Sequence, residues 1–259
     1  MRFCRPEKAN SMSKSFWKEF PSSISELEKD PAVRVLIISG EGKNFSSGMD
    51  LSVFSDPSLL NSSDARNRDR LRGLILELQA AFSCLEKIRI PVIAAVQGAC
   101  VGAALDLVSA CDLRFAVSTA YFTIHEINLA MMADLGSLQR LPKCLPEGIV
   151  RELAYTGDRL AATRAQTYGF INSCFESEAE MMAHVMVQAK KIASKSPLAI
   201  ASSKEAITYA RSHSVEEALL HTAILQTAIL DLDDLAAAAK AQASKSEAKF
   251  KDRLPSAAL

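Results

Sequence analysis

Three carboxylates lie close together along an apolar part of the chain, where small or hydrophobic residues would serve a plain core. They are Asp106, Glu126 and Asp134. Burying a carboxylate is costly unless it is paired, and desolvation raises its pKa toward values useful for proton transfer. One such acid alone is most simply a capping or solvent-facing residue. The grouping of three predicts a site of general acid and base chemistry.

Two stretches rich in small residues could supply a different function, the stabilisation of negative charge. In "GKNFSSGMDL", residues 42–51, a glycine permits close backbone approach, so the N–H of Met49 could face a ligand. In "QGACVGAALDL", residues 97–107, small residues follow a strand and open a helix, where N–H groups lack partners. Met49 and Ala103 together would form an oxyanion hole with two donors. Taken separately, a tight turn and close helix packing explain these stretches equally well.

The elements that would position these groups alternate between strand and helix. Apolar runs predict strands at 33–39, 90–98, 113–117 and 121–127, and amphipathic spacing predicts helices at 11–30, capped by Ser11 or Ser13, and at 68–88. Between them, 51–66 is polar and predicts a mobile loop. A strand over 121–127 would turn His125 outward, beside Glu126. This alternation favours an α/β fold with crossover connections.

The remainder of the chain, from about Glu147, has a helical pattern. It consists of successive alanine-rich amphipathic segments, of which 235–250 is the last. This pattern predicts a helical region packed on the first part of the chain or on a neighbouring subunit.

Composition excludes several classes of protein. Hydrophobic residues make up 49% of the 259 and charged residues 23%, and Lys plus Arg equals Asp plus Glu at 30 each. A zero net charge argues against nucleic acid or an anionic membrane as a partner. Six scattered cysteines predict free thiols in a reducing compartment, with no metal site. The termini show no targeting signal, so a cytoplasmic location is expected by default, and incomplete termini would leave a mitochondrial or peroxisomal one open.

Four motifs, in this order, resemble the crotonase (enoyl-CoA hydratase/isomerase) superfamily. They are "CRPEKANSM", "FSSGMDL", "PVIAAVQGACVGAALDLVSACDLRFA" and "EINLAMMADLGSLQRLP", and together they extend the resemblance over nearly the whole chain. One departure is that Gly102, Ala103 and Ala104 stand where the family usually has three glycines.

The resemblance implies a fold, a substrate class and site residues. It implies a spiral of ββα units over 1–190 and a helical region over 191–259 that assembles trimers or dimers of trimers. The substrate would be an acyl-CoA thioester, with no cofactor and no metal. Its carbonyl would be held as an enolate by the N–H groups of Met49 and Ala103. The expected substrate contacts are Ser47, Gly48, Asp50, Leu51 and Gly102, together with Phe250 and Lys251 of the last helix, which would approach the CoA of a neighbouring subunit.

The three acids distinguish reactions within the superfamily. Hydratases typically carry Glu at the positions of Asp106 and Glu126 and a small residue at that of Asp134. The set found here resembles the subgroup that isomerises 3,5-dienoyl-CoA to 2,4-dienoyl-CoA in unsaturated fatty acid β-oxidation. Moving two conjugated double bonds requires a base at one end of the diene and an acid at the other. We expect Asp134 to remove the C2 proton, Glu126 to protonate C6, and Asp106 to stabilise the arrangement.

Two alternatives stay open on the sequence alone. One is 2-enoyl-CoA hydration or isomerisation of 3-enoyl-CoA to 2-enoyl-CoA, favoured if Asp134 lies away from the pocket. The other is a protein of this fold that has lost catalysis and serves as a scaffold or binds RNA. Zero net charge and the retention of all three acids argue against the second alternative.

Overall fold

Two small β-sheets form the centre of the molecule in the computed structural model, which describes residues 1–55 and 62–254. The larger sheet is parallel, in the order β1-β2-β3-β5-β8, and the smaller has the order β4-β6-β7, with β7 antiparallel. The strands are β1 (Arg2–Phe3), β2 (Leu36–Gly40), β3 (Val92–Val96), β4 (Ala99–Val101), β5 (Leu113–Val117), β6 (Tyr121–Thr123), β7 (Leu160–Ala161) and β8 (Ser173–Phe175).

The chain builds the two sheets together by repeating one step. Strand β3 of the larger sheet leads directly into β4 of the smaller one, and β5 leads into β6 in the same way. One helix returns the chain from β4 to β5, and several short helices and β7 connect β6 to β8. All five residues of β3 are buried, as the continuous apolar run of a central parallel strand requires. These repeated β-β-α steps confirm the predicted spiral.

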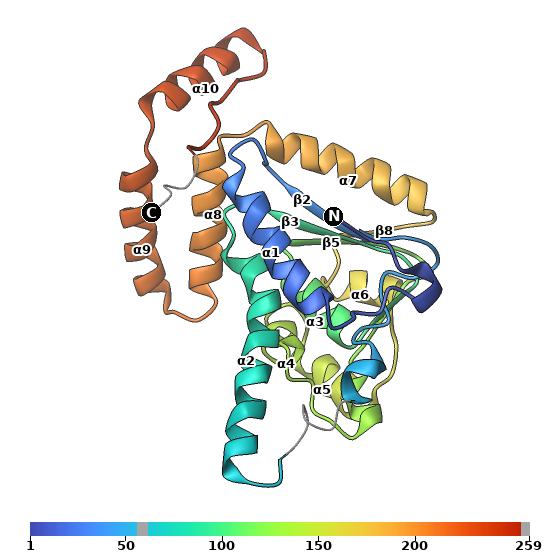
Figure 1. The fold of residues 1–259 in the computed structure, drawn as a ribbon. Coiled ribbons are helices and arrows are strands. Elements are labelled where there is room, and N and C mark those ends of the chain that lie inside the picture. The colour runs from blue at the N-terminus through green and yellow to red at the C-terminus, as the bar shows by residue number, and fades with distance from the viewer. Residues whose placement is uncertain (56–61, 255–259) are drawn as a thin grey trace.

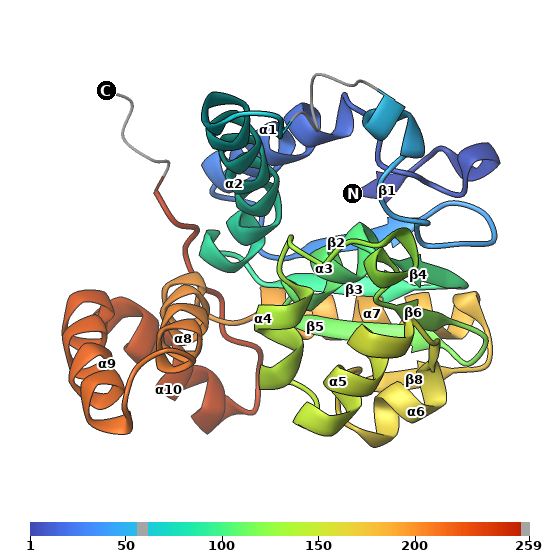
Figure 2. The same ribbon diagram turned by 90° about the horizontal axis from the view of Figure 1, so that it is seen from below.

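Helices cover both faces of the larger sheet (Figures 1 and 2). Helix α7 lies on one face and contacts β3, β5 and β8, whereas α1 and α2 pack together on the other side. The helices are α1 (Phe16–Lys29), α2 (Ala65–Lys87), α3 (Ala103–Ser109), α4 (Ser137–Arg140), α5 (Glu147–Thr156), α6 (Ala162–Thr167), α7 (Glu178–Ala193), α8 (Pro197–Ala210), α9 (Val215–Ile229) and α10 (Leu232–Ser244). Short 3-10 turns are η1 (Pro6–Lys8), η2 (Leu51–Ser55), η3 (Glu126–Leu129) and η4 (Leu141–Lys143).

Helices α8, α9 and α10 project from one side of this body (Figure 1). A buried lysine, Lys204, joins α8 to the body: its Nζ donates to the carbonyls of Leu85, at 2.6 Å, and Ile90, at 3.0 Å. The same ammonium pairs with Asp112 at 2.8 Å, so the buried charge is compensated. The predicted division at 190 falls inside α7, which packs on the sheet, and the two-part division stays a prediction.

Three predicted elements differ from the structure. The first long helix begins at Phe16, later than a cap at Ser11 or Ser13 implies, because residue 12 is paired with Met49 in a parallel bridge. The predicted strand over 121–127 ends at Thr123. The predicted last helix ends at Ser244, since Lys245 adopts a left-handed conformation, and 247–254 is irregular. Of the predicted loop 51–66, residues 56–61 lie outside the described part of the chain.

Candidate active site

The smaller sheet, the 47–53 segment, α2 and η3 line a cavity of about 1190 Å³. One part of its wall is apolar and comes from α2 and the 129–135 segment; another is polar and comes from the first residues of the chain and from β6. The residues that line it include Ser47, Met49, Asp50, Leu51, Gln79, Val101, Gly102, Ala103, Tyr121, His125, Glu126, Asn128, Asp134, Leu135 and Arg159. A concave, mostly apolar site with a few charged groups suits a small molecule with a long apolar part.

Met49 and Ala103, the two predicted oxyanion donors, lie on this cavity. The N–H group of each has no partner in its own bridge or helix, for a different reason in each case. Met12 donates to Gly48 O at 2.8 Å and accepts from Asp50 N at 3.0 Å, so the peptide N–H of Met49 between them faces the opposite side. Ala103 is the first residue of α3, and a first-turn N–H has no partner within its helix. Both residues line the cavity, which supports the oxyanion-hole prediction.

Two glycines allow these segments to approach each other. Gly48 has φ +85°, and a Cβ there would overlap the carbonyl oxygen of Val101, next to the second donor. Gly102 has φ +55°, and a Cβ there would lie 3.1 Å from the Glu126 carboxyl group. Both positions therefore require glycine. The departure at Ala104 has no effect on the cavity wall, because that side chain is fully buried.

Glu126 begins the η3 turn and lines the cavity beside Gly102. Burial, followed by the charge of Asp106, raises the pKa of Glu126 to about 7. One of its carboxyl oxygens is buried without a hydrogen-bond partner among the described residues. A carboxyl group held close to half-protonated at neutral pH is suited to donate a proton. His125, expected to point outward from a strand, instead precedes this turn and lines the cavity, within 3.3 Å of Asn128 Nδ2.

Asp134 lines the cavity from the segment that leads into α4, and its carboxyl group is half-buried. Burial raises the pKa of Asp134 above its usual value. Its backbone carbonyl accepts a 2.6 Å hydrogen bond from the side chain of Gln79 on α2. The two acids Glu126 and Asp134 thus share one cavity and come from different segments.

Asp106 differs from the other two acids because it is fully buried within α3 and is not one of the residues that line the cavity. Its Oδ1 accepts two hydrogen bonds from Ser137, from the backbone N–H at 2.5 Å and from the hydroxyl at 2.6 Å. Burial raises the pKa of Asp106 to about 6, and these hydrogen bonds oppose the shift.

The remaining predicted substrate contacts divide into two groups. Ser47, Asp50 and Leu51 line the cavity, while Gly48 shapes the backbone behind it. Hydrogen bonds from Ser52 and Ser11 hold the pKa of Asp50 at about 2, so it is an anion at the rim. Phe250 and Lys251 lie on the irregular tail, where the Lys251 ammonium pairs with Asp233 at 2.9 Å. Their predicted role concerns a neighbouring subunit and stays a prediction.

Sequence reasoning missed several residues of the site because their partners are distant in sequence. Ser137 meets an acid 31 residues away, and Gln79 meets a carbonyl 55 residues away. Tyr121 and Arg159 also line the cavity, with the guanidinium carbon 4.2 Å from the ring centre. The antiparallel pairing of β6 with β7 brings them together, and no local pattern predicted that pairing.

A metal centre and a membrane-spanning helix are both absent from residues 1–55 and 62–254. This part of the chain contains no group of three or more His, Cys, Asp or Glu side chains arranged to hold a metal ion. Nor does it contain a helix with the length and apolar character needed to span a bilayer.

Comparison with known proteins agrees with this geometry. Residues 1–253 match the enoyl-CoA hydratase/isomerase family. A peroxisomal delta(3,5)-delta(2,4)-dienoyl-CoA isomerase of Arabidopsis thaliana is 41% identical over 95% of this chain and 90% of its own length. The mitochondrial enzyme of that name from Mus musculus is 37% identical, over 95% and 76%.

A solved structure extends the comparison to the fold. The crystal structure of an enoyl-CoA hydratase from Bacillus anthracis superposes with a TM-score of 0.87 at 27% identity, covering 97% of this chain and 94% of that one. The spiral of two sheets, the cavity lined by the backbone of Met49 and Ala103 and these matches have one explanation: the chain belongs to the enoyl-CoA hydratase/isomerase family, the crotonase superfamily.

Proposed function

We propose that this enzyme converts 3,5-dienoyl-CoA to 2,4-dienoyl-CoA in the oxidation of unsaturated fatty acids. The observation that carries the proposal is the presence of both Glu126 and Asp134 on the cavity that also holds the two backbone donors. The similarity to relatives that are named for this reaction supports the same conclusion.

The first step is the removal of the C2 proton. Asp134, as the carboxylate, takes that proton, and the electrons of the C–H bond pass to the thioester carbonyl as a conjugated enolate. The N–H groups of Met49 and Ala103 would stabilise the oxygen that gains charge, and losing one such donor commonly costs about 3 kcal/mol.

The second step is protonation at the far end of the conjugated system. Glu126 starts protonated and transfers its proton to C6, and the electrons return from the enolate to form the C2=C3 and C4=C5 double bonds. The raised pKa of Glu126 favours this starting state near neutral pH. Asp134 then holds a proton and Glu126 does not, so exchange with solvent must restore both before the next turnover.

Asp106 argues against hydration as the main activity. A hydratase uses two acids at the positions of Asp106 and Glu126 to hold one water molecule. Here Asp106 is fully buried, does not line the cavity, and has one oxygen engaged twice by Ser137. Hydration of 2-enoyl-CoA and isomerisation of 3-enoyl-CoA therefore rank second.

One assay tests the proposal directly. Purified protein is offered 3,5-octadienoyl-CoA and crotonyl-CoA in parallel, and formation of the conjugated 2,4-dienoyl thioester is followed by its near-ultraviolet absorbance. We expect a rise with the dienoyl substrate that Asp134→Asn abolishes while the far-ultraviolet circular dichroism is unchanged. Efficient hydration of crotonyl-CoA with no change in the dienoyl substrate would overturn the assignment.

A homotrimeric or homohexameric assembly is part of the same proposal. Helix α9 and the start of α10 carry large apolar side chains that are more than half exposed in the single chain: Val215, Leu219, Leu220, Ile224, Leu230, Leu232 and Leu235. Contiguous apolar surface of this kind supports contact with further copies. Sedimentation equilibrium checks it, and a monomer would contradict it.

The named relatives are peroxisomal or mitochondrial proteins, and the location of this chain stays a prediction.

A further inference from the structure

The segment from Asp134 to Ser137 is held by a series of side chains. Gln79 holds the carbonyl of Asp134, at 2.6 Å, and Ser137 binds Asp106. Between these two anchors, the carbonyl of Leu135 accepts a 3.2 Å hydrogen bond from Nη1 of Arg140. The carbonyl of the residue that follows the proposed base is therefore bound to a cation.

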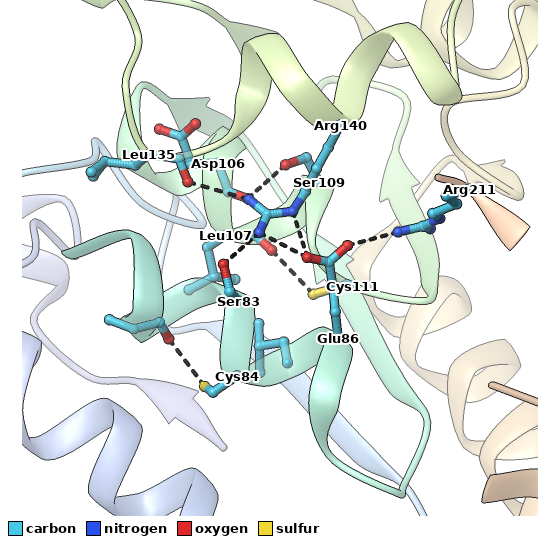
Figure 3. A network of polar contacts seen from close by, with 12 residues as sticks. Ser83, Cys84, Glu86, Asp106, Leu107, Ser109, Cys111, Leu135, Arg140 and Arg211 are labelled. Carbon is cyan, nitrogen blue, oxygen red and sulfur yellow. Dashed lines mark hydrogen bonds and ion pairs between the residues drawn. The ribbon is translucent and has the colours of Figure 1, made fainter. Parts of the chain in front are cut away.

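That cation is itself fixed in direction by helix α2 (Figure 3). Nε of Arg140 donates to Glu86 at 2.8 Å, and Nη2 donates to the hydroxyl of Ser83 at 2.9 Å. Gly136 leaves the space that the guanidinium fills, since a Cβ there would overlap it, and its φ of +131° disfavours any other residue. A planar guanidinium with three partners in fixed directions has little freedom to rotate.

The acceptor on α2 is held from its other side as well. Oε1 of Glu86 accepts a 2.7 Å hydrogen bond from Arg211, in the turn that follows α8. The side chains of Arg140 and Glu86 are only 12% and 18% exposed, so their ion pair is shielded from solvent. A chain of contacts thus runs from the helical C-terminal region, through α2, to the peptide beside Asp134.

We propose that Arg140, oriented by Glu86, is a positioning residue that fixes the direction of the Asp134 carboxylate through the Leu135 carbonyl. The inference rests on the proposed function of Asp134 as the base. Arg140 does not line the cavity, so its effect passes through the backbone and not through contact with substrate.

A second explanation is that Arg140 acts through its charge alone, because it also lowers the pKa of Asp106. Two variants separate the explanations. Arg140→Lys keeps the positive charge, but a single ammonium cannot satisfy Glu86, Ser83 and the Leu135 carbonyl in their present directions. Arg140→Met removes the charge as well. Ser83→Ala is the matched control, since it removes one partner and leaves the ion pair and the contact with Leu135.

The experiment measures kcat and KM for 3,5-octadienoyl-CoA in the full-length variants, with thermal unfolding to confirm that each is folded. We expect Arg140→Lys and Arg140→Met both to lower kcat by about 10- to 100-fold with KM unchanged, because a displacement of about 1 Å can cost about 100-fold in rate. Ser83→Ala should keep wild-type kcat. In the Asp134→Asn background, Arg140→Lys should cause no further loss.

Glu86→Asp tests the inference if the Arg140 variants do not fold. It keeps both charges of the ion pair but draws the carboxylate back from Arg140, so it should also lower kcat. A wild-type kcat in Arg140→Lys would overturn the inference, as would a higher KM at constant kcat. Absence of turnover in the wild-type protein would instead overturn the proposed function, on which the inference depends.

Discussion

Asp106 and Asp134 are the same residue type in two contrasting surroundings, one inside α3 and the other on the cavity wall. Asp106 is fully buried in α3, with Ser137 engaging one oxygen twice. Asp134 is half-buried, lies on the cavity wall, and is anchored through its backbone carbonyl. The contrast indicates that one acid contributes charge to the site while the other can reach a substrate.

Glu126 shows how the two acids differ in effect. After burial, the charge of Asp106 is the largest influence that raises the pKa of Glu126, and Asp134 contributes less. The buried acid therefore adds to the effect of burial in favouring protonated Glu126, while the half-buried Asp134 is the proposed base. Each prediction below alters one side of this contrast.

The largest effect should come from exchanging each acid for its amide. Asp134→Asn removes the proposed base, so kcat for 3,5-octadienoyl-CoA should fall about 100- to 10,000-fold, the usual contribution of a general base. In Asp106→Asn, kcat at the optimal pH of the variant should fall much less. Steady-state kinetics on both variants checks this, and an equal loss in the two would remove the distinction between them.

The pH dependence should change in the variant that stays active. Loss of the Asp106 charge lowers the pKa of Glu126 from about 7, so less of Glu126 is protonated at neutral pH. The falling limb of kcat at high pH should therefore move to lower pH in Asp106→Asn. A kcat profile between pH 5 and 9 measures it. An unmoved limb would show that Asp106 has no electrostatic influence on the acid.

The stability of the fold should depend on pH through Glu126. Its folded pKa, about 7, is raised above the ordinary value of 4.5, so burial favours the protonated form. The resulting stability is fully present below the unfolded pKa and is lost as pH rises toward the folded one. We expect the free energy of unfolding of the wild-type protein to fall by on the order of 2 kcal/mol between pH 4.5 and 8 through this group, and Glu126→Gln to lack that fall. Urea unfolding of both proteins across that range checks it; parallel curves would contradict it.

An effect of similar size on stability should follow Ser137→Ala. It removes the hydroxyl that donates to Asp106 but keeps the backbone N–H. A hydrogen bond to a charged group contributes about 1.5 to 3 kcal/mol, so the free energy of unfolding should fall by about that amount at pH 8. The loss should be smaller at pH 5, where Asp106, with a pKa of about 6, is mostly protonated. A loss that is the same at both pH values would show that Asp106 does not change its protonation state between pH 5 and 8, contrary to a pKa of about 6.

Local patterns predicted the parts of the site that depend on local structure. The strand over 113–117 matches β5 in its bounds, and the small residues after β4 open α3 at Ala103. The prediction that Glu126 lies in a strand was wrong, since it begins the η3 turn. The apolar alternation continues past Thr123, but the strand pairing with β4 ends there. Nothing near Arg140 indicates its partner Glu86, which is 54 residues away and is brought close only by packing of α2. Contacts across the fold therefore had to come from the structure.

The most direct test of the account follows deuterium at C2 of 3,5-octadienoyl-CoA in heavy water. Glu126→Gln should keep the base and lose the acid, so the enolate would form, take deuterium back at C2, and yield no 2,4-dienoyl product. Asp134→Asn should lose C2 exchange and product formation together, each by about 100- to 10,000-fold. Deuterium exchange in Asp134→Asn, together with none in Glu126→Gln, would contradict the assignment of base and acid to these two residues.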